Sequence, residues 1–388
     1  MFFNRSSLPF PEDLSDALGK TLWPEGEPRL LEQRQAALRR LWPKLAKERG
    51  QAQPSETHYS FRREEADAYA AYYLPANCLK VALILEECFL AGIDPLPGKE
   101  SSWLDFGTGP GTAYWGLAWW CARRKKNVRF TGWDQSPVFQ ALARDLVASG
   151  PYNVQATFLA GKGDPLELIK KQRPTHVSFL NSIAEIYPDP ARRIEELAKI
   201  MRELRALKNL DGQERFLVIA EPGSRESSRE LAELKDKLQA VRLGRVLFPC
   251  LDSRPCGALR DPRDWCHEET ACDFPEWLNE LGAGAGLRKE SMIFSYALFN
   301  TDDPLEAGTG LRMVSQRMER KGQVECRLCT AEGKRPARVQ RSKAHEKNEF
   351  FLSSVRGDMW KSAILGEKND VESAEEMIPT DTRSVFHD

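Results

Sequence analysis

The chain has 388 residues, of which 41% are hydrophobic and 29% charged, and its formal net charge is −1. This length exceeds one compact domain, so two or three structural units are expected. The charge near zero excludes a global basic field, so contact with nucleic acid requires a local basic surface. We find no apolar run of transmembrane length and no secretory signal pattern, and therefore expect a soluble intracellular protein without a membrane partner.

The first 95 residues show helical periodicity. Apolar residues recur at helical spacing in 30–50 and again in 64–92, where Pro75 interrupts the pattern. Residues 1–95 are therefore predicted to form an N-terminal helical region.

From residue 96 to residue 300, strand patterns alternate with helical patterns. Strand-like segments at 101–106, 127–134, 175–182, 214–223 and 289–300 are separated by amphipathic or apolar helical segments. This alternation predicts an α/β domain with a parallel sheet covered on both faces, as in a Rossmann-like fold. Residues 249–275, rich in proline and cysteine, interrupt it and are predicted to be an insertion.

The remaining chain has a different composition. Short alternating segments and glycine turns within 305–362 predict a small C-terminal β unit. Residues 363–388 are acidic and polar and are predicted to be a disordered tail.

A glycine loop joins the first predicted strand of the α/β domain to its helix. Gly107, Gly109 and Gly111 permit tight turning and close approach of the backbone to a ligand, and Asp134 ends the next strand, where a carboxylate accepts hydrogen bonds from ribose hydroxyls. Asp105 precedes the first glycine by two residues, and the spacing is G-x-G-x-G rather than the dinucleotide spacing G-x-G-x-x-G. An acid there suits the cationic methionine end of S-adenosylmethionine better than a pyrophosphate. The loop therefore predicts an S-adenosylmethionine-dependent methyltransferase fold.

The catalytic residues of a methyltransferase are not identifiable from the sequence. The strand that ends near Asn181 lacks the Pro-Pro-aromatic turn of many amino methyltransferases. Pro249-Cys250 and Pro255-Cys256 superficially resemble a cytosine-type nucleophile, but a metal site explains both cysteines better. Methyl transfer is left open at this point.

Several cysteines cluster in or after the predicted insertion. Thiolates in proline-rich loops are candidates for a tetrahedral zinc site or an iron–sulfur cluster, and unrelated buried thiols are the alternative. The candidates are Cys250, Cys256, Cys266, His267, Cys272, Cys326 and Cys329.

Eight segments together resemble the methyltransferase-like assembly factors of the mitochondrial small ribosomal subunit, a family with bacterial members. The resemblance covers about residues 59–360. The segments are AYAAYYLPANC (68–78), LDFGTGPGTA (104–113), DQSPVF (134–139), AEPGS (220–224), FPCLDSRPC (248–256), DWCHEE (264–269), VECRLCTAEGK (324–334) and RGDMW (356–360).

The resemblance implies a four-iron cluster and bound S-adenosylmethionine. Carried over residue by residue, the cluster ligands fall on Cys250, Cys256, Cys266 and Cys329, with Cys326 or Cys272 as reserves. The cofactor residues are those of the glycine loop and its two acids: Asp105, Gly107, Gly109, Gly111 and Asp134. On this interpretation the metal joins residue 329 to residues 250–266, so loss of the cluster should detach the C-terminal unit.

The partner implied by the family is small-subunit ribosomal RNA or a ribosome precursor, and no DNA is expected. A basic segment, 333–347, gives independent support because it concentrates cations that suit phosphates, although a solvated charged face is the alternative. The location implied is the cytoplasm for a bacterial-type member and the mitochondrial matrix for a eukaryotic one.

Two other functions stay open at this point. One is an active RNA methyltransferase, and the other is a zinc-stabilised RNA-binding protein with a vestigial cofactor pocket.

Overall fold

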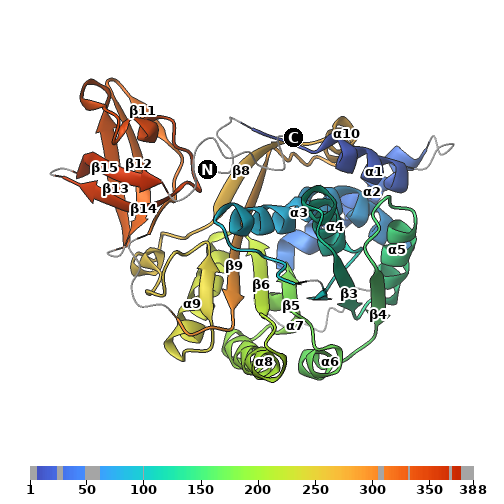
Figure 1. Ribbon diagram of the computed structural model, residues 1–388. Coiled ribbons are helices and arrows are strands. Elements are labelled where there is room, and N and C mark those ends of the chain that lie inside the picture. Colours follow the sequence, from blue (N-terminus) through green and yellow to red (C-terminus); the bar gives the residue numbers. More distant parts are fainter. Residues whose placement is uncertain are drawn as a thin grey trace.

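The computed structural model describes residues 7–23, 29–48, 62–98, 100–304, 310–330, 333–366 and 369–376. A nine-stranded sheet forms the centre of the molecule, in the order β1-β8-β9-β6-β5-β2-β3-β4 with β7 paired to β9 (Figure 1). The strands are β1 (Leu8–Pro9), β2 (Ser101–Phe106), β3 (Val128–Asp134), β4 (Ala156–Ala160), β5 (His176–Leu180), β6 (Phe216–Pro222), β7 (Arg245–Phe248), β8 (Glu268–Asp273) and β9 (Ser291–Asn300).

The strands β2 to β6 are parallel, and β9 runs antiparallel to β6, β7 and β8. Because β3 lies on one side of β2 and β5 on the other, the chain reverses direction across the sheet at β2, and ligands of open α/β sheets bind beyond the carboxyl ends of strands at such a point. The predicted Rossmann-like α/β fold is confirmed. The glycine loop, which follows β2, lies at this switch point.

Helices cover both faces of the sheet, because alternate strand residues face two separate hydrophobic cores. Trp103 packs in one core with α3, α4 and α5, and its neighbour Leu104 packs in the other with α6, α8 and α9. The helices are α1 (Glu12–Leu22), α2 (Leu30–Glu48), α3 (Arg63–Leu90), α4 (Thr112–Arg124), α5 (Pro137–Ala148), α6 (Pro165–Gln172), α7 (Ile183–Ile186), α8 (Pro190–Asp211), α9 (Arg225–Ala240) and α10 (Glu276–Gly284).

Helix α3 runs without a break through Pro75, although the sequence predicts an interruption there. It is also long and apolar enough to cross a membrane by length and composition, contrary to the sequence-based expectation that no segment is. Its apolar window is 89% buried inside the molecule, which is what the core helix of a soluble fold shows. A side chain at Gly116 of α4 would collide with the carbonyl oxygen of Cys78, so α3 and α4 cross in close contact. The N-terminal helices thus share a core with the sheet, and a division at residue 95 stays a proposal.

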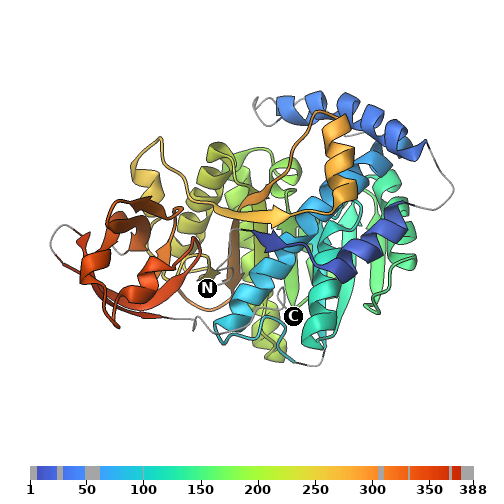
Figure 2. The ribbon, with the colours of Figure 1, turned by 90° about the horizontal axis from the view of Figure 1, so that it is seen from above.

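A second, smaller sheet lies at one end of the central sheet, on the side of α9 and β8 and far from β4 (Figures 1 and 2). Its order is β11-β12-β10-β14-β15, with β13 paired to β12, and it encloses a hydrophobic core of its own. The strands are β10 (Leu311–Met313), β11 (Met318–Arg320), β12 (Gln323–Thr330), β13 (Gly333–Gln340), β14 (Met359–Leu365) and β15 (Val371–Glu376).

Three expectations about local structure are wrong. Residues 371–376 pair with β14 as a strand inside the segment predicted to be disordered, and residues 377–388 of that segment lie outside the described residues. Residues 349–352, which lie inside the predicted C-terminal β unit, form a 3-10 helix rather than a strand. The last part of the predicted insertion, 268–273, is β8 and belongs to the central sheet.

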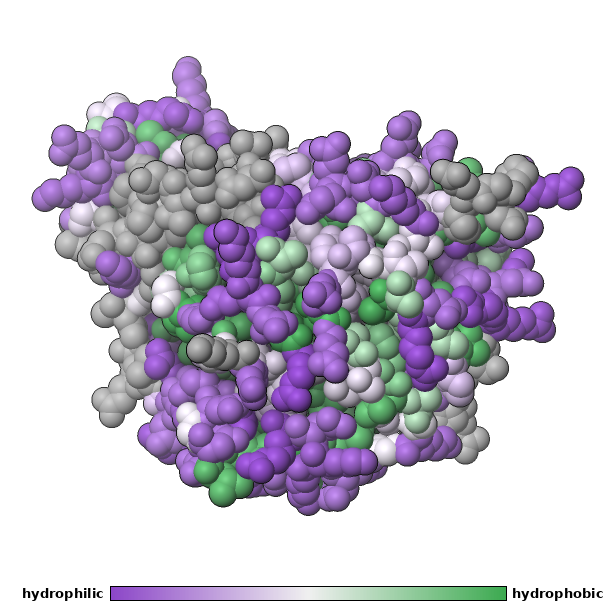
Figure 3. Space-filling view, turned by 45° about the vertical axis from the view of Figure 1, so that its right-hand side comes forward, coloured by the Kyte–Doolittle hydropathy of each residue, from purple (hydrophilic) through white to green (hydrophobic). Residues whose placement is uncertain are grey.

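The surface shows no single apolar face among the described residues visible in Figure 3: hydrophilic residues dominate its outline, and smaller hydrophobic areas lie between them. The exposed large hydrophobic side chains are spread over separate elements: Trp42, Leu210, Val241, Ile293 and Met318. Such scattered residues do not mark an interface.

Candidate functional site

The glycine loop after β2 has the conformation that its sequence requires. Gly107, Gly109 and Gly111 all have positive φ, at 70°, 52° and 86°, in the left-handed region that side chains disfavour. A Cβ at Gly107 would also lie 2.4 Å from the Cβ of Ser182, which follows β5. The first glycine is therefore fixed by conformation and by close packing between the two strand ends.

Asp134 at the end of β3 faces the same loop. Its Oδ2 accepts a hydrogen bond from the Gly109 amide at 2.8 Å, and its Oδ1 accepts one from the Ser136 amide at 2.8 Å. A carboxylate has about four lone-pair positions, so each oxygen keeps capacity for one further donor. Two ribose hydroxyls are donors of this kind, and Asp134 thus fits the predicted cofactor.

Asp105 lies beneath the loop rather than on its surface. Its side chain is 1% exposed, and its Oδ1 accepts a hydrogen bond of 2.5 Å from Ser178 on β5, which in turn accepts one from the Trp103 indole at 2.7 Å. Burial raises the pKa of Asp105 to about 7. The described contacts give Asp105 a bracing role between β2 and β5, and its contact with the methionine end of a cofactor stays a prediction.

The turn after β5 brings together polar groups that the sequence alone did not connect. Asn181 has a positive φ of 54°, and its Oδ1 accepts a hydrogen bond from the buried Lys80 of α3 at 3.4 Å. Glu221, at the end of β6, accepts a hydrogen bond from the Ile183 amide at 3.3 Å. The AEPGS motif was the only sequence signal for Glu221, and Lys80 had none. Both groups lie at the carboxyl edge of the sheet.

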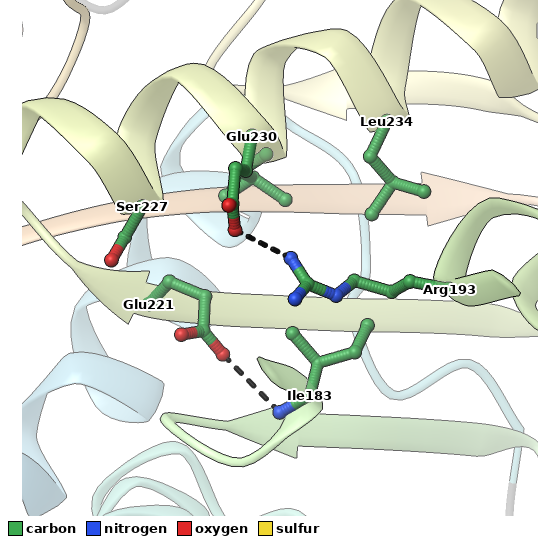
Figure 4. A pocket seen from close by; sticks show the side chains of 7 residues that line it. Ile183, Arg193, Glu221, Ser227, Glu230 and Leu234 are labelled. Carbon is green, nitrogen blue, oxygen red and sulfur yellow. Dashed lines mark hydrogen bonds and ion pairs between the residues drawn. The ribbon is translucent and has the colours of Figure 1, made fainter. Parts of the chain in front are cut away.

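Glu221 lines a small cavity behind that turn, together with the ion pair between Arg193 and Glu230 (Figure 4). Ile183 and three residues of α9, Ser227, Leu231 and Leu234, complete its wall. Burial raises the pKa of Glu221 to about 7. Its carboxylate fixes the position of the turn that packs against Gly107.

The four predicted cysteine ligands come from four places in the chain. Cys250 follows β7, Cys256 precedes the 3-10 helix η1 (Gly257–Arg260), Cys266 precedes β8, and Cys329 lies on β12 of the small sheet. Gly257 and Gly333 touch here, since a Cβ on Gly257 would lie 2.4 Å from the Cα of Gly333. This backbone contact brings β12 and β13 against residues 250–266, the cysteine segment.

The four thiols lie close enough to interact electrostatically. Burial, and then Cys256, Cys250 and Cys329, raise the pKa of Cys266 well above its usual value. Burial, and then Cys250 and Cys256, raise the pKa of Cys329 to about 12. The structure therefore brings all four predicted thiols together.

No tight metal site is formed by the residues that the structure describes: among them, no three His, Cys, Asp or Glu side chains are arranged to hold a metal ion. The geometry alone thus supports neither zinc nor an iron–sulfur cluster. The chemistry of the donor set, four convergent thiols with the Lys235 ammonium 3.7 Å from the Cys250 sulfur, nevertheless fits a thiolate-ligated group.

The reserve cysteines lie elsewhere. Cys326 is 1% exposed in the core of the small sheet, and because it is three residues from Cys329 on the same strand, the two side chains face opposite sides. Cys272 of β8 is 4% exposed in the main core. His267 stacks on Trp265 beside Cys266, with ring centroids 5.6 Å apart.

Part of the basic segment 333–347 is paired with acidic residues of the protein. Lys334 forms an ion pair with Asp264 at 2.7 Å, and Arg338 forms one with Asp370 at 2.7 Å. Arg341 pairs with Glu319 at 3.2 Å. The local charge predicted for RNA contact is thus partly neutralised by acids that are distant in the sequence.

Residues 63–364 match the model of a family described as mitochondrial small ribosomal subunit Rsm22. This range contains the glycine loop, Asp134 and all four converging cysteines. No curated protein matches the chain significantly.

Solved structures that resemble the chain include several methyltransferases. One is a protein from Listeria monocytogenes that is assigned as a class I S-adenosylmethionine-dependent methyltransferase (13% identity, covering 75% of this chain and 88% of that chain, TM-score 0.34). A second is the METTL16 MTase domain (12% identity, covering 69% of this chain and 92% of that chain, TM-score 0.33). A third is the plantazolicin methyltransferase BpumL in complex with SAH (11% identity, covering 75% of this chain and 96% of that chain, TM-score 0.31). Overlaps this small add nothing to what the strand order shows.

Proposed function

Because the chain belongs to the mitochondrial small ribosomal subunit Rsm22 family, we propose that it is an assembly factor of a small ribosomal subunit that binds S-adenosylmethionine and a four-iron cluster. One observation carries this proposal: the family match spans both the glycine loop at the switch point of the sheet and the four thiols that converge between the two sheets.

The cofactor part of the proposal rests on the carboxyl edge of the sheet. S-adenosylmethionine supplies an activated methyl group on a sulfonium centre. Asp134 would accept the ribose hydroxyls, and the three glycines of the loop would allow the backbone to approach the ligand. Asp105 would act from beneath, by holding the loop against β5.

Isothermal titration of S-adenosylmethionine tests this part. We expect binding by the wild-type chain and a loss of about tenfold or more in Asp134→Asn, whose amide replaces one acceptor oxygen by a donor. Asp189→Asn, which changes an exposed N-cap of α8, is the matched control and should bind like the wild type. Equal affinity in all three proteins would contradict the assignment of Asp134.

The cluster part of the proposal assigns Cys250, Cys256, Cys266 and Cys329 as ligands. An iron–sulfur cluster supplies a rigid, multivalent link between thiolates, so it would join the cysteine segment to β12. Lys235 would offset part of the negative charge of the thiolates, since its ammonium lies beside Cys250.

Anaerobic purification followed by absorption spectroscopy and analysis of iron, sulfide and zinc tests this part. We expect iron and sulfide with a broad charge-transfer absorption in the wild type and in Cys326→Ser, and their loss in Cys329→Ser. A colourless protein loaded with zinc would favour the zinc-stabilised alternative. Unchanged iron and sulfide in Cys329→Ser would exclude that residue as a ligand.

An active methyltransferase is a second candidate, favoured by one observation. Asn181 stands in a left-handed conformation at the carboxyl end of β5, held by Lys80, and unusual backbone conformations concentrate at functional sites. Transfer of labelled methyl groups to precursor small-subunit RNA, lost in Asn181→Ala, would establish this activity. If the chain bound the cofactor but transferred no methyl group to any subunit precursor, the active methyltransferase would be excluded and the assembly role would be the one that remains.

The proposed partner is the RNA of a small ribosomal subunit precursor, in mitochondria or in a bacterial cytoplasm. The exposed Lys343 and Lys347 are the cations of the basic segment most open to phosphates. Co-sedimentation of the chain with small-subunit precursors tests the partner, and fractionation of the native cells tests the location. Free chain at the top of every gradient would contradict the proposal.

A further inference from the structure

Helix α9 binds the connecting segment between two of the four cysteines through a single guanidinium. Arg229 Nη1 lies 3.3, 2.9 and 2.7 Å from the carbonyl oxygens of Ala258, Asp261 and Asp264. Its Nη2 lies 3.4 Å from the carbonyl oxygen of Leu259. All four carbonyls belong to the stretch that joins Cys256 to Cys266.

The same face of α9 contacts the segment at its other end. Asp236, two turns after Arg229, accepts hydrogen bonds from the Cys256 amide at 3.1 and 2.9 Å. Lys235 donates to the carbonyl oxygen of Arg254 at 3.2 Å. The segment from residue 254 to residue 264 is therefore held along one helix (Figure 1).

A guanidinium is suited to this task because it presents five N–H donors in a fixed planar fork. Residues 257–264 form one short 3-10 turn, followed by a turn in which the Asp264 amide donates to the Asp261 carbonyl at 3.0 Å, so this stretch has little regular secondary structure. Arg229 lies within hydrogen-bond distance of four of these carbonyl groups, and the three acceptors of Nη1 share its two hydrogens. An ammonium or an apolar side chain at this position cannot reproduce the fork.

We propose that Arg229 is a positioning residue of the thiol site, which sets the separation of Cys256 and Cys266 before any iron is bound. The inference rests on the proposed function for its assignment of the cysteines as ligands. The hydrogen bonds of Arg229 to described residues all go to backbone carbonyl oxygens and not to the four sulfurs. Its effect passes through the backbone of residues 258–264.

The test compares full-length Arg229→Met and Arg229→Lys with Arg225→Met, which removes an exposed arginine one turn earlier on the same helix. The first measurement is hydrogen exchange of the amides of 257–266 in the iron-free protein. We expect faster exchange in this segment for Arg229→Met, an intermediate rate for Arg229→Lys, and no change in the control. The exchange of β2 to β6 should stay unchanged in every variant.

The second measurement is reconstitution with ferrous iron and sulfide, followed by release of iron to a chelator. We expect at least about tenfold faster release from Arg229→Met than from the control, as for other residues that orient metal ligands. If Arg229→Met showed the same amide exchange in 257–266 and the same rate of iron release as the wild type, the proposal would be overturned. If the wild type takes up no iron, the proposed function fails, and the exchange experiment alone still decides whether Arg229 orders the segment. Should Arg229→Met unfold, Arg229→Lys carries both comparisons.

Discussion

Arg312 of β10 joins the small sheet to the central one, and its replacement by methionine gives the sharpest stability prediction. Its side chain is 4% exposed, and its guanidinium forms ion pairs with Glu87 of α3 and Glu268 of β8. Tyr296 also donates to Glu87, at 2.5 Å. Arg312→Met removes the cation paired with the buried Glu87 and with Glu268, whose side chain is 12% exposed, and breaking a buried pair in this way costs about 3–5 kcal/mol. We expect a loss of this size at pH 7.5.

The loss should depend on pH in a definite direction. Burial already raises the pKa of Glu268, and removal of Arg312 raises it further because the main favourable charge is gone. A carboxyl group whose pKa is higher in the folded state than in the unfolded chain destabilises the fold once the pH exceeds its pKa in the unfolded chain. The deficit of Arg312→Met should therefore shrink as the pH falls from 7.5 to 5.

Urea unfolding at both pH values, followed by tryptophan fluorescence, measures this deficit. Arg320→Met removes a mostly exposed arginine from the same sheet and should cost less than about 0.5 kcal/mol. Glu87→Gln added to Arg312→Met should recover part of the loss, since one of the two charges is then absent. A deficit below about 1 kcal/mol, or one that is the same at pH 5 and pH 7.5, would refute this account of the network.

Two further predictions concern the carboxyl edge of the sheet. Glu221→Gln should be more stable than the wild type by up to about 3 kcal/mol at pH 8, because a pKa raised from 4.5 to about 7 costs the folded state stability as the pH rises through that range. In urea titrations the gain should vanish near pH 4.5. A gain independent of pH would contradict this prediction. Gly107→Ala should lose about 1–3 kcal/mol and weaken cofactor binding, since it combines a positive φ with a collision at Ser182. Gly98→Ala has a positive φ of 91° and open space around it, so it isolates the backbone effect, and equal losses in the two variants would show that the collision does not matter.

The sequence predicts what depends on neighbouring residues. The glycine loop and Asp134 follow from local strand and turn patterns, and the positive φ of Gly107 is what a glycine at that position indicates. It does not predict pairs made by the tertiary fold. Ser178 reaches Asp105 across 73 residues, and Glu87 reaches Arg312 across 225.

Charge and thiol patterns show the same limit. The acids that neutralise Lys334 and Arg338 lie on other segments, so a basic run in the sequence overstates the free positive charge. The choice between Cys326 and Cys329 depends on which face of β12 meets the cysteine segment, and a strand pattern alone does not give that direction. The β15 strand was missed because its acidic composition disfavours a strand until β14 supplies the pairing.

The position of Cys329 changes what loss of a cluster is expected to do. In the register of the small sheet, Cys329 on β12 lies opposite Arg312 on β10, so the proposed ligand sits beside the ion network that joins the two sheets. The Arg312 network, the Lys334–Asp264 pair and the contact of Gly257 with Gly333 need no metal. We therefore expect the C-terminal sheet of Cys329→Ser to stay docked after the iron is lost, whereas Arg312→Met, which loses the most deeply buried of these contacts, should release it more readily. Limited proteolysis between the two sheets distinguishes these outcomes. If Cys329→Ser were cleaved rapidly while Arg312→Met were cleaved at the wild-type rate, thiol ligation, and not the ion network, would hold the sheets together.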